Sequence, residues 1–458
     1  MRSYVKPIIC FLIAAIMGVL FIAFMTPPIR NDSKSYHSRG MILSEKNTGN
    51  ILAYRFPNRE PVYPVFLGIC FKIFGHNDNA VRFVQVILSA FTSFLVYSLA
   101  TQFYGKNIGF ISGLLYSFCP SFAYYPTFFL TETLAVFLFV FAYWLAMKAI
   151  STENVFIIVC AGLCLTIASL TKYPFLFFGI FIVTLSFMFN GREFYLKKKL
   201  LLIILVIGLL PLICFIIWSY SYSDSEASDD YRLFKTIFIS SSELTLTQRE
   251  QTAKIVGLVS RNLGELIFPY VNFRDLWPYP KKKVAELYNK ADEKYANLDR
   301  KSDRYFRIIL DLYKEHPYRY ALSRVSVLMR LNALQYPSRL NETDRWKDFY
   351  NRSNNKTVGF ILADFLLKTL TNPVLWFICG LLVIKRLGMK VMPILLPVLY
   401  INIVYCPFEG APRFAMPILP FYLIGGAAMM FYLLKKLEHK FVCFEKFVRY
   451  FGKKVNAF

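Results

Sequence analysis

Acidic residues and histidines are scarce in this chain. Its 458 residues include 29 Asp and Glu against 53 Lys and Arg, with only four histidines, so the formal net charge is +24. With so few carboxylates, any general base must come from a short list. Outside 222–357 and the predicted inner face, the carboxylates are Asp32, Glu45, Glu60, Asp78, Glu132, Asp364 and Glu409.

Paired cysteine motifs are absent as well. The chain has nine cysteines, but no two of them stand in a CxxC spacing, and most lie in or beside apolar runs. This pattern excludes a disulfide framework and a cysteine zinc site. The cysteines are interpreted as small buried hydrophobic residues.

Long apolar runs dominate what is present. Hydrophobic residues make up 56% of the chain, and the runs reach about 20 residues, which is the length needed to cross a bilayer. This excludes a cytosolic globular enzyme and a disordered chain. We expect about ten transmembrane helices, at 7–25, 80–102, 107–120, 128–148, 154–170, 173–190, 200–221, 358–384, 391–406 and 414–434.

The basic residues predict the orientation of these spans. Lys and Arg gather in alternate loops and in the C-terminal tail, while the short loops between them carry almost none. By the positive-inside rule both termini are cytoplasmic, and the first run is a retained signal anchor. The apolar segment 62–75 is too short to span and is expected on the membrane surface. The basic residues of the predicted cytoplasmic face thus account for most of the positive charge. The charge therefore does not indicate a nucleic-acid partner, and none is expected.

The predicted fold is an all-α polytopic membrane protein of the plasma (inner) membrane. Residues 1–221 form a first transmembrane module, which includes the outer loop 26–79. Residues 222–357 are too charged to cross the membrane and show apolar residues at helical spacing, so we expect an extracytoplasmic, mostly helical domain. Residues 358–434 form the C-terminal transmembrane helices, and 435–458 form a basic cytoplasmic tail.

Short motifs recur at the outer ends of the predicted spans. The first outer loop contains Asp32-Ser33-Lys34-Ser35-Tyr36 and Arg59-Glu60-Pro61-Val62-Tyr63-Pro64. Later junctions read Leu130-Thr131-Glu132-Thr133, Thr171-Lys172-Tyr173-Pro174 and Pro412-Arg413-Phe414-Ala415-Met416-Pro417.

In order and spacing, these motifs resemble the GT-C membrane glycosyltransferases, including protein O-mannosyltransferases, the lipid A aminoarabinose transferase and bacterial enzymes like them. The resemblance implies a GT-C fold and an inverting transfer of a sugar from a polyprenyl-phosphate carrier to an acceptor hydroxyl on the outer face. The acceptor class is open between protein, lipid and polysaccharide, and membrane lipids are the remaining partners. The chain departs from the pattern at Glu60, where many relatives have proline.

The resemblance also assigns roles. Asp32 is the expected general base, and the alternative for it is a solvated acid that caps a helix N-terminus. Glu132 is expected to assist Asp32, and the alternative for it is an acid at the membrane interface. Lys172, Arg59 and Arg413 are the expected ligands of the carrier phosphate, with ordinary lipid headgroups as the alternative.

The resemblance gives a substrate-positioning role to Tyr36, Tyr63 and Glu60. The alternative role for Tyr36 is that of an aromatic residue at the membrane interface. No metal ligand is predicted, because His37 and His316 lack ligand partners at fixed spacing. A dependence on a divalent metal stays open, and no other cofactor is expected.

Three other classes compete with the glycosyltransferase. An O-antigen ligase or polymerase would share the topology but not the motifs. A secondary transporter or flippase predicts charges near the bilayer midplane and symmetry between the halves, neither of which is seen. A scaffold protein gives no reason for Lys172 or Glu132.

Overall fold

Within the part of the chain that the structure describes, every regular element is a helix. The computed structural model describes residues 5–30, 32–45, 60–184, 199–220, 241–259, 261–272, 276, 281–298, 301–332, 372–406 and 412–455. No strand occurs in these ranges. The all-α fold class is therefore confirmed for the described residues.

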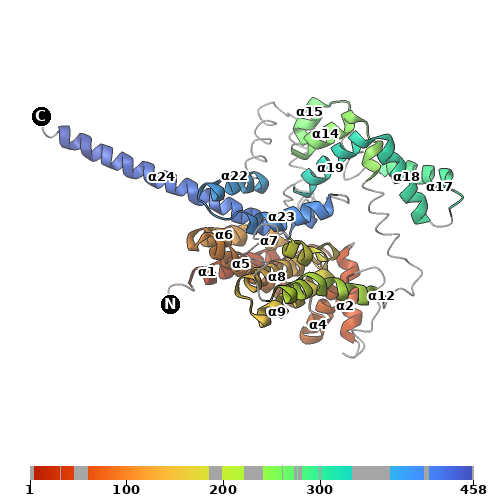
Figure 1. The fold of residues 1–458 in the computed structure, drawn as a ribbon, viewed down its shortest axis with the longest axis horizontal. Helices are drawn as coiled ribbons and strands as arrows, with labels where there is room; N and C mark the ends of the chain where they lie inside the picture. The colour runs from red at the N-terminus through yellow and green to blue at the C-terminus, as the bar shows by residue number, and fades with distance from the viewer. Residues whose placement is uncertain are drawn as a thin grey trace.

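Five helices from the first half of the chain form the centre of the molecule (Figure 1). Helix α5 packs against α1, α6 and α8, and α8 packs against α9. Buried residues occupy most of the surface of α8, and a stripe that includes Phe137, Phe141, Trp144 and Lys148 is partly exposed, as expected of a helix largely enclosed by others. The bounds are α1 (Val5–Met25), α5 (Asp78–Tyr104), α6 (Lys106–Phe118), α8 (Glu132–Thr152) and α9 (Val155–Thr171).

Three described helices, α1, α5 and α8, are long and apolar enough to cross a membrane. Shorter apolar helices cover other expected spans, among them α9 and α23 (Met392–Tyr405). The expected spans at 173–190 and 358–384 lie partly outside the described residues. The number of ten spans therefore stays a prediction.

Helices α2 (Asp32–Glu45) and α4 (Val62–Phe74) pack closely against each other because glycine stands at their contact. A Cβ atom on Gly40 would lie 2.6 Å from the Cβ of Leu67, and one on Gly68 would lie 2.8 Å from the Cβ of Leu43. A side chain at either glycine would push the helices apart. This contact holds α2, which begins at Asp32, against α4.

The polar segment supplies the amphipathic helices that its pattern predicts. In α18 the buried residues Tyr305, Ile308, Ile309 and Leu312 follow helical spacing and form a small core with residues of α17. These helices gather on one side of the molecule in Figure 1. Their bounds are α14 (Gln248–Val259), α15 (Arg261–Ile267), α17 (Lys281–Lys294), α18 (Lys301–Glu315) and α19 (Pro317–Leu331).

The last helix, α24 (Leu419–Val455), packs against α6 and α22 (Pro373–Arg386) and then extends away from the bundle (Figure 1). It continues without a break through most of the predicted basic tail. The remaining elements are α7 (Pro120–Tyr124), η1 (Tyr125–Thr127), η2 (Tyr173–Phe175), α11 (Leu200–Ile203), η3 (Ile204–Leu209), α12 (Leu210–Tyr220), η4 (Ser242–Thr245) and η6 (Pro412–Ala415).

Candidate active site

Four of the predicted site residues meet in one charged cluster, although they are far apart in the sequence. Arg413 Nη1 donates a hydrogen bond to Asp32 Oδ2 at 3.1 Å, and Arg413 Nε lies 4.0 Å from Glu132 Oε1. The same Glu132 oxygen lies 3.5 Å from Lys172 Nζ. The result is a chain of alternating charge, which we call the charged cluster: Lys172, Glu132, Arg413 and Asp32.

Each member of the charged cluster stands at the end of a helix or in a short turn. Asp32 and Glu132 are the first residues of α2 and α8, where the partial positive charge of a helix N-terminus favours a carboxylate. Lys172 caps the C-terminus of α9 in an extended conformation, and the following Pro174 prevents the helix from continuing. Arg413 lies in η6, just before α24.

Burial divides the cluster into an inner and an outer pair. The side chains of Glu132 and Lys172 are 3% and 8% exposed, whereas those of Asp32 and Arg413 are 33% and 38% exposed. The inner pair is shielded from water, and the outer pair can reach a substrate. A carboxylate in the outer pair is thus accessible to an acceptor group.

An aromatic ring supports both cations of the cluster. Lys172 Nζ lies 5.4 Å from the centroid of the Phe414 ring, and the Arg413 guanidinium carbon lies 5.3 Å from it. The Tyr405 ring stacks on the Phe414 ring at 5.0 Å. Cation–π contacts of this kind stabilise a positive charge in a partly dry site without neutralising it. The two cations are therefore held close together while keeping their charge for a ligand.

The pKa of the Arg413 guanidinium stands above its ordinary value. Burial alone would lower this pKa, but the carboxylates of Glu132 and Asp32, and the hydrogen bond to Asp32, more than offset the effect. Arg413 therefore stays positively charged over the whole pH range in which the protein is folded.

Two polar atoms of the inner pair are not satisfied by hydrogen bonds. Lys172 Nζ and Glu132 Oε2 are buried and have no hydrogen-bond partner among the described residues. The 3.5 Å contact between Lys172 and Glu132 is an ion pair only. Leaving such groups unsatisfied is costly in a protein interior, so the ammonium group of Lys172 is available to donate to an anionic ligand.

The predicted tyrosines lie beside the charged cluster and are buried. Tyr36 is one helical turn after Asp32, and its ring meets the Tyr63 ring edge to face at 5.2 Å. The Tyr63 hydroxyl donates to Gln85 Oε1 at 3.0 Å. Both tyrosines therefore pack behind Asp32. Glu60 is half-buried just before α4, and Arg59 lies outside the described residues.

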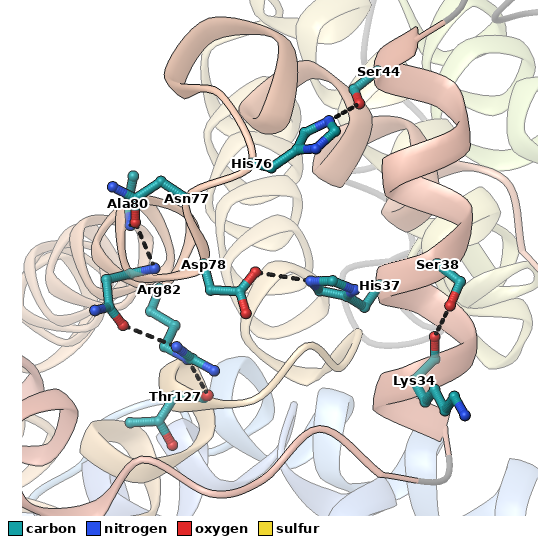
Figure 2. Close-up of polar contacts among 11 residues, drawn as sticks. Lys34, His37, Ser38, Ser44, His76, Asn77, Asp78, Ala80, Arg82 and Thr127 are labelled. Carbon is teal, nitrogen blue, oxygen red and sulfur yellow. Dashed lines mark hydrogen bonds and ion pairs between the residues drawn. The ribbon is translucent and has the colours of Figure 1, made fainter.

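Sequence reasoning missed a second ion pair on α2. His37 Nε2 lies 2.8 Å from Asp78 Oδ1 at the start of α5 (Figure 2). The His37 ring also packs against Phe129. The two residues are 41 positions apart, and no motif joins them. This pair is separate from the charged cluster and ties α2 to α5.

The described carboxylates and histidines do not assemble into a metal site. No group of three or more His, Cys, Asp or Glu side chains in the described ranges lies close enough to hold an ion. The two carboxylates of the charged cluster are engaged by Arg413 instead.

Residues 57–218 match the family model described as dolichyl-phosphate-mannose-protein mannosyltransferase. This range contains the α4, Glu132 and Lys172 motifs. No curated protein sequence matches the chain.

Solved structures of an oligosaccharyltransferase from Archaeoglobus fulgidus share the fold. One is AglB in complex with an inhibitory peptide and a dolichol-phosphate, with a TM-score of 0.51 and 14% identity over 97% of this chain and 52% of that chain. Another is tethered with an acceptor peptide containing the NVT sequon, with a TM-score of 0.50 and 14% identity over 95% of this chain and 50% of that chain. The present chain thus spans about half the length of these enzymes. Taken together, the matched family model and the shared helical fold support the resemblance of the chain to the GT-C membrane glycosyltransferases.

Proposed function

We propose that the protein transfers a sugar from a polyprenyl-phosphate carrier to an acceptor hydroxyl, with inversion, on the outer face of the plasma membrane. The observation that carries this proposal is the charged cluster, which places a half-exposed carboxylate beside two cations. The reaction needs both: a base for the acceptor, and positive charge for the phosphate leaving group. A dolichol-phosphate is bound by the AglB structure of the same fold, which supports a lipid carrier.

Asp32 is the proposed base. As the acceptor oxygen attacks the anomeric carbon, its proton passes to the Asp32 carboxylate. Arg413 donates to one oxygen of this carboxylate and so fixes its orientation. The half-exposed position of Asp32 gives an acceptor from the aqueous side access to it.

Lys172 and Arg413 are the proposed ligands of the carrier phosphate, with Arg59 as a third. When the bond between the anomeric carbon and the phosphate oxygen breaks, its electron pair stays on that oxygen. The ammonium and guanidinium groups stabilise the resulting anion, and no proton donor is required. Glu132 contacts both cations and is proposed to hold them at the separation that a phosphate needs.

The proposed membrane arrangement places this chemistry outside the cell. Both termini are cytoplasmic, about ten helices span the bilayer, and the segment 222–357 lies on the outer side with the acceptor. Tyr36, Tyr63 and Glu60 are proposed to shape the site, and a divalent metal requirement is open to direct titration. Because the fold neighbours include one with an acceptor peptide, a protein acceptor is the first to test.

The experiment that tests the function uses purified protein and a panel of labelled polyprenyl-phosphate sugars. We expect release of polyprenyl phosphate together with transfer of the label to a peptide, lipid or polysaccharide acceptor. If every donor fails while reconstituted vesicles take up or flip a substrate, the protein is a transporter. Transfer of a preassembled polymer from a diphosphate carrier would instead favour the ligase class.

Replacement of Arg413 by lysine tests whether activity requires one guanidinium to contact both Asp32 and Glu132. An ammonium group has no planar fork and cannot contact Asp32 and Glu132 as Arg413 does, so we expect Arg413→Lys to lower kcat/KM roughly 10- to 100-fold although the positive charge is kept. The control is Arg386→Lys, which removes a guanidinium at the C-terminal end of α22 that donates a hydrogen bond to the Tyr432 hydroxyl of α24. Equal kcat/KM values for Arg413→Lys and the wild type would contradict the proposed geometry.

A further inference from the structure

A stripe of polar side chains on α5 binds the backbone that leads to Glu132. Ser89 Oγ donates to the carbonyl of Phe122 at 3.0 Å. One helical turn earlier, Gln85 Nε2 donates to the carbonyls of Pro126 and Phe128, each at 2.9 Å. The earlier Arg82 Nε donates to the Thr127 carbonyl at 3.0 Å, as Figure 2 shows.

The carbonyls that Gln85 and Arg82 bind belong to the segment 125–131, which begins with the short helix η1 and ends where α8 begins, whereas the Phe122 carbonyl lies in α7. Such a short segment cannot satisfy all of its own backbone groups, and burial makes each unpaired carbonyl costly. Gln85 and Arg82 therefore supply from α5 the donors that a helix would have supplied internally. The residue whose position this fixes is Glu132, only four residues after Phe128.

Gln85 differs from the other residues of the stripe because both its N–H groups and its oxygen form hydrogen bonds with segments that lead to the charged cluster. It is fully buried, its two N–H groups bind the 125–131 segment, and its oxygen accepts from the Tyr63 hydroxyl. Tyr63 in turn packs its ring against Tyr36, one turn from Asp32. A single carboxamide thus connects the backbone before Glu132 to the helix pair that carries Asp32.

We infer that Gln85 is a positioning residue, which sets the placement of Glu132 relative to Asp32 through the 125–131 backbone and Tyr63. This inference rests on the proposed glycosyl transfer, because that reaction requires Glu132 and Asp32 to be held at a fixed separation. Gln85 touches no substrate. It acts through the charged cluster, whose two phosphate-binding cations it leaves in place.

The test compares Gln85→Met, which keeps the length of the side chain but removes its polar atoms, with Ser89→Ala. Ser89 is the matched control because it is buried on the same face and also binds one carbonyl, but that carbonyl lies in α7, well before Glu132. Gln85→Met is expected to lower kcat about 100-fold, the effect of a small misplacement in an active site, with the KM for the donor within twofold of wild type. Ser89→Ala is expected to keep both constants.

Tyr63→Phe keeps the inference testable if Gln85→Met does not fold. It removes only the hydroxyl that bonds to Gln85 and retains the ring contact with Tyr36, so a smaller loss, about tenfold in kcat, is expected. In the double variant the two losses should not multiply, because both break the same connection. Wild-type kcat in Gln85→Met, or a loss of equal size in Ser89→Ala, would overturn the inference while leaving the glycosyltransferase proposal intact.

Hydrogen–deuterium exchange supplies a readout that needs no activity. Gln85→Met should speed exchange of the amides of Phe128 and Ala135, whereas Ser89→Ala should affect only amides around Phe122. If the wild type transfers no sugar from any donor, the proposed function fails, and this comparison alone decides whether Gln85 holds the segment. Unchanged exchange over 125–135 in Gln85→Met would overturn the inference on its own.

Discussion

Asp32→Asn is expected to slow sugar transfer by about 10²- to 10⁴-fold while leaving the carrier bound. Asparagine keeps the shape of the side chain and can still accept a hydrogen bond from Arg413, but it cannot take the proton of the acceptor hydroxyl. Loss of a general base costs about 10²- to 10⁴-fold in rate, so kcat should fall by roughly that factor. The donor KM should stay close to the wild-type value because Lys172 and Arg413 remain. The measurement is transfer of labelled sugar at saturating donor.

The matched control for this prediction is Asp78→Asn. Asp78 is also the first residue of a helix, its side chain is also 33% exposed, and it also forms an ion pair, but with His37. Asp78 lies outside the charged cluster, so its variant should transfer sugar within about threefold of the wild-type rate, the scale of a lost surface ion pair. Retained transfer by Asp32→Asn, or equal losses in the two variants, would remove Asp32 from the role of base.

Lys172→Met is expected to have the second largest effect, on donor binding. Removing one charge-assisted contact to phosphate costs about 1.5–3 kcal/mol, which corresponds to a roughly 10- to 100-fold fall in kcat/KM for the donor. The variant should also be less stable, because among the described residues it leaves the buried carboxylate of Glu132 with only the 4.0 Å contact to Arg413. The readouts are donor titration and thermal unfolding in detergent.

A double variant separates these two effects. Adding Glu132→Gln to Lys172→Met removes the unpaired buried charge, so the unfolding temperature should recover while donor binding does not. Lys283→Met serves as the control, because it breaks an ion pair of 3.0 Å with Glu250 in the polar segment and should not change donor kinetics. Recovery of donor binding together with stability would mean that Lys172 balances charge and does not bind the phosphate.

The sequence alone identified the members of the charged cluster but not their arrangement. Asp32, Glu132, Lys172 and Arg413 could be selected because they stand in motifs that resemble those of the GT-C enzymes, and because charged residues at the ends of apolar spans are few and costly. Their convergence depends on the packing of α2, α8 and α9 around the turn at η6, and Asp32 and Arg413 are 381 positions apart. Local patterns carry no information on such distant contacts.

The supporting residues were harder to predict. Gln85 stands in an apolar run, where a lone glutamine has no motif and no charge to mark it, and its role becomes visible only when the carbonyls of 126 and 128 are placed beside it. The His37–Asp78 pair was missed for the same reason. The helices were predicted well, because apolar runs and helical spacing are properties of the local sequence. The number of membrane crossings also depends on how the helices pack and lie in the bilayer, which the local sequence does not specify.

The most direct test of the account is a structure of the full chain in nanodiscs with a polyprenyl phosphate bound. We expect phosphate oxygens to lie about 2.7–2.9 Å from Lys172 Nζ and the Arg413 guanidinium, the usual length of charge-assisted hydrogen bonds. The Asp32 carboxylate should face the position that the transferred sugar occupies. A phosphate bound elsewhere, with Lys172 still paired only to Glu132, would contradict the central claim that the charged cluster is the site of transfer.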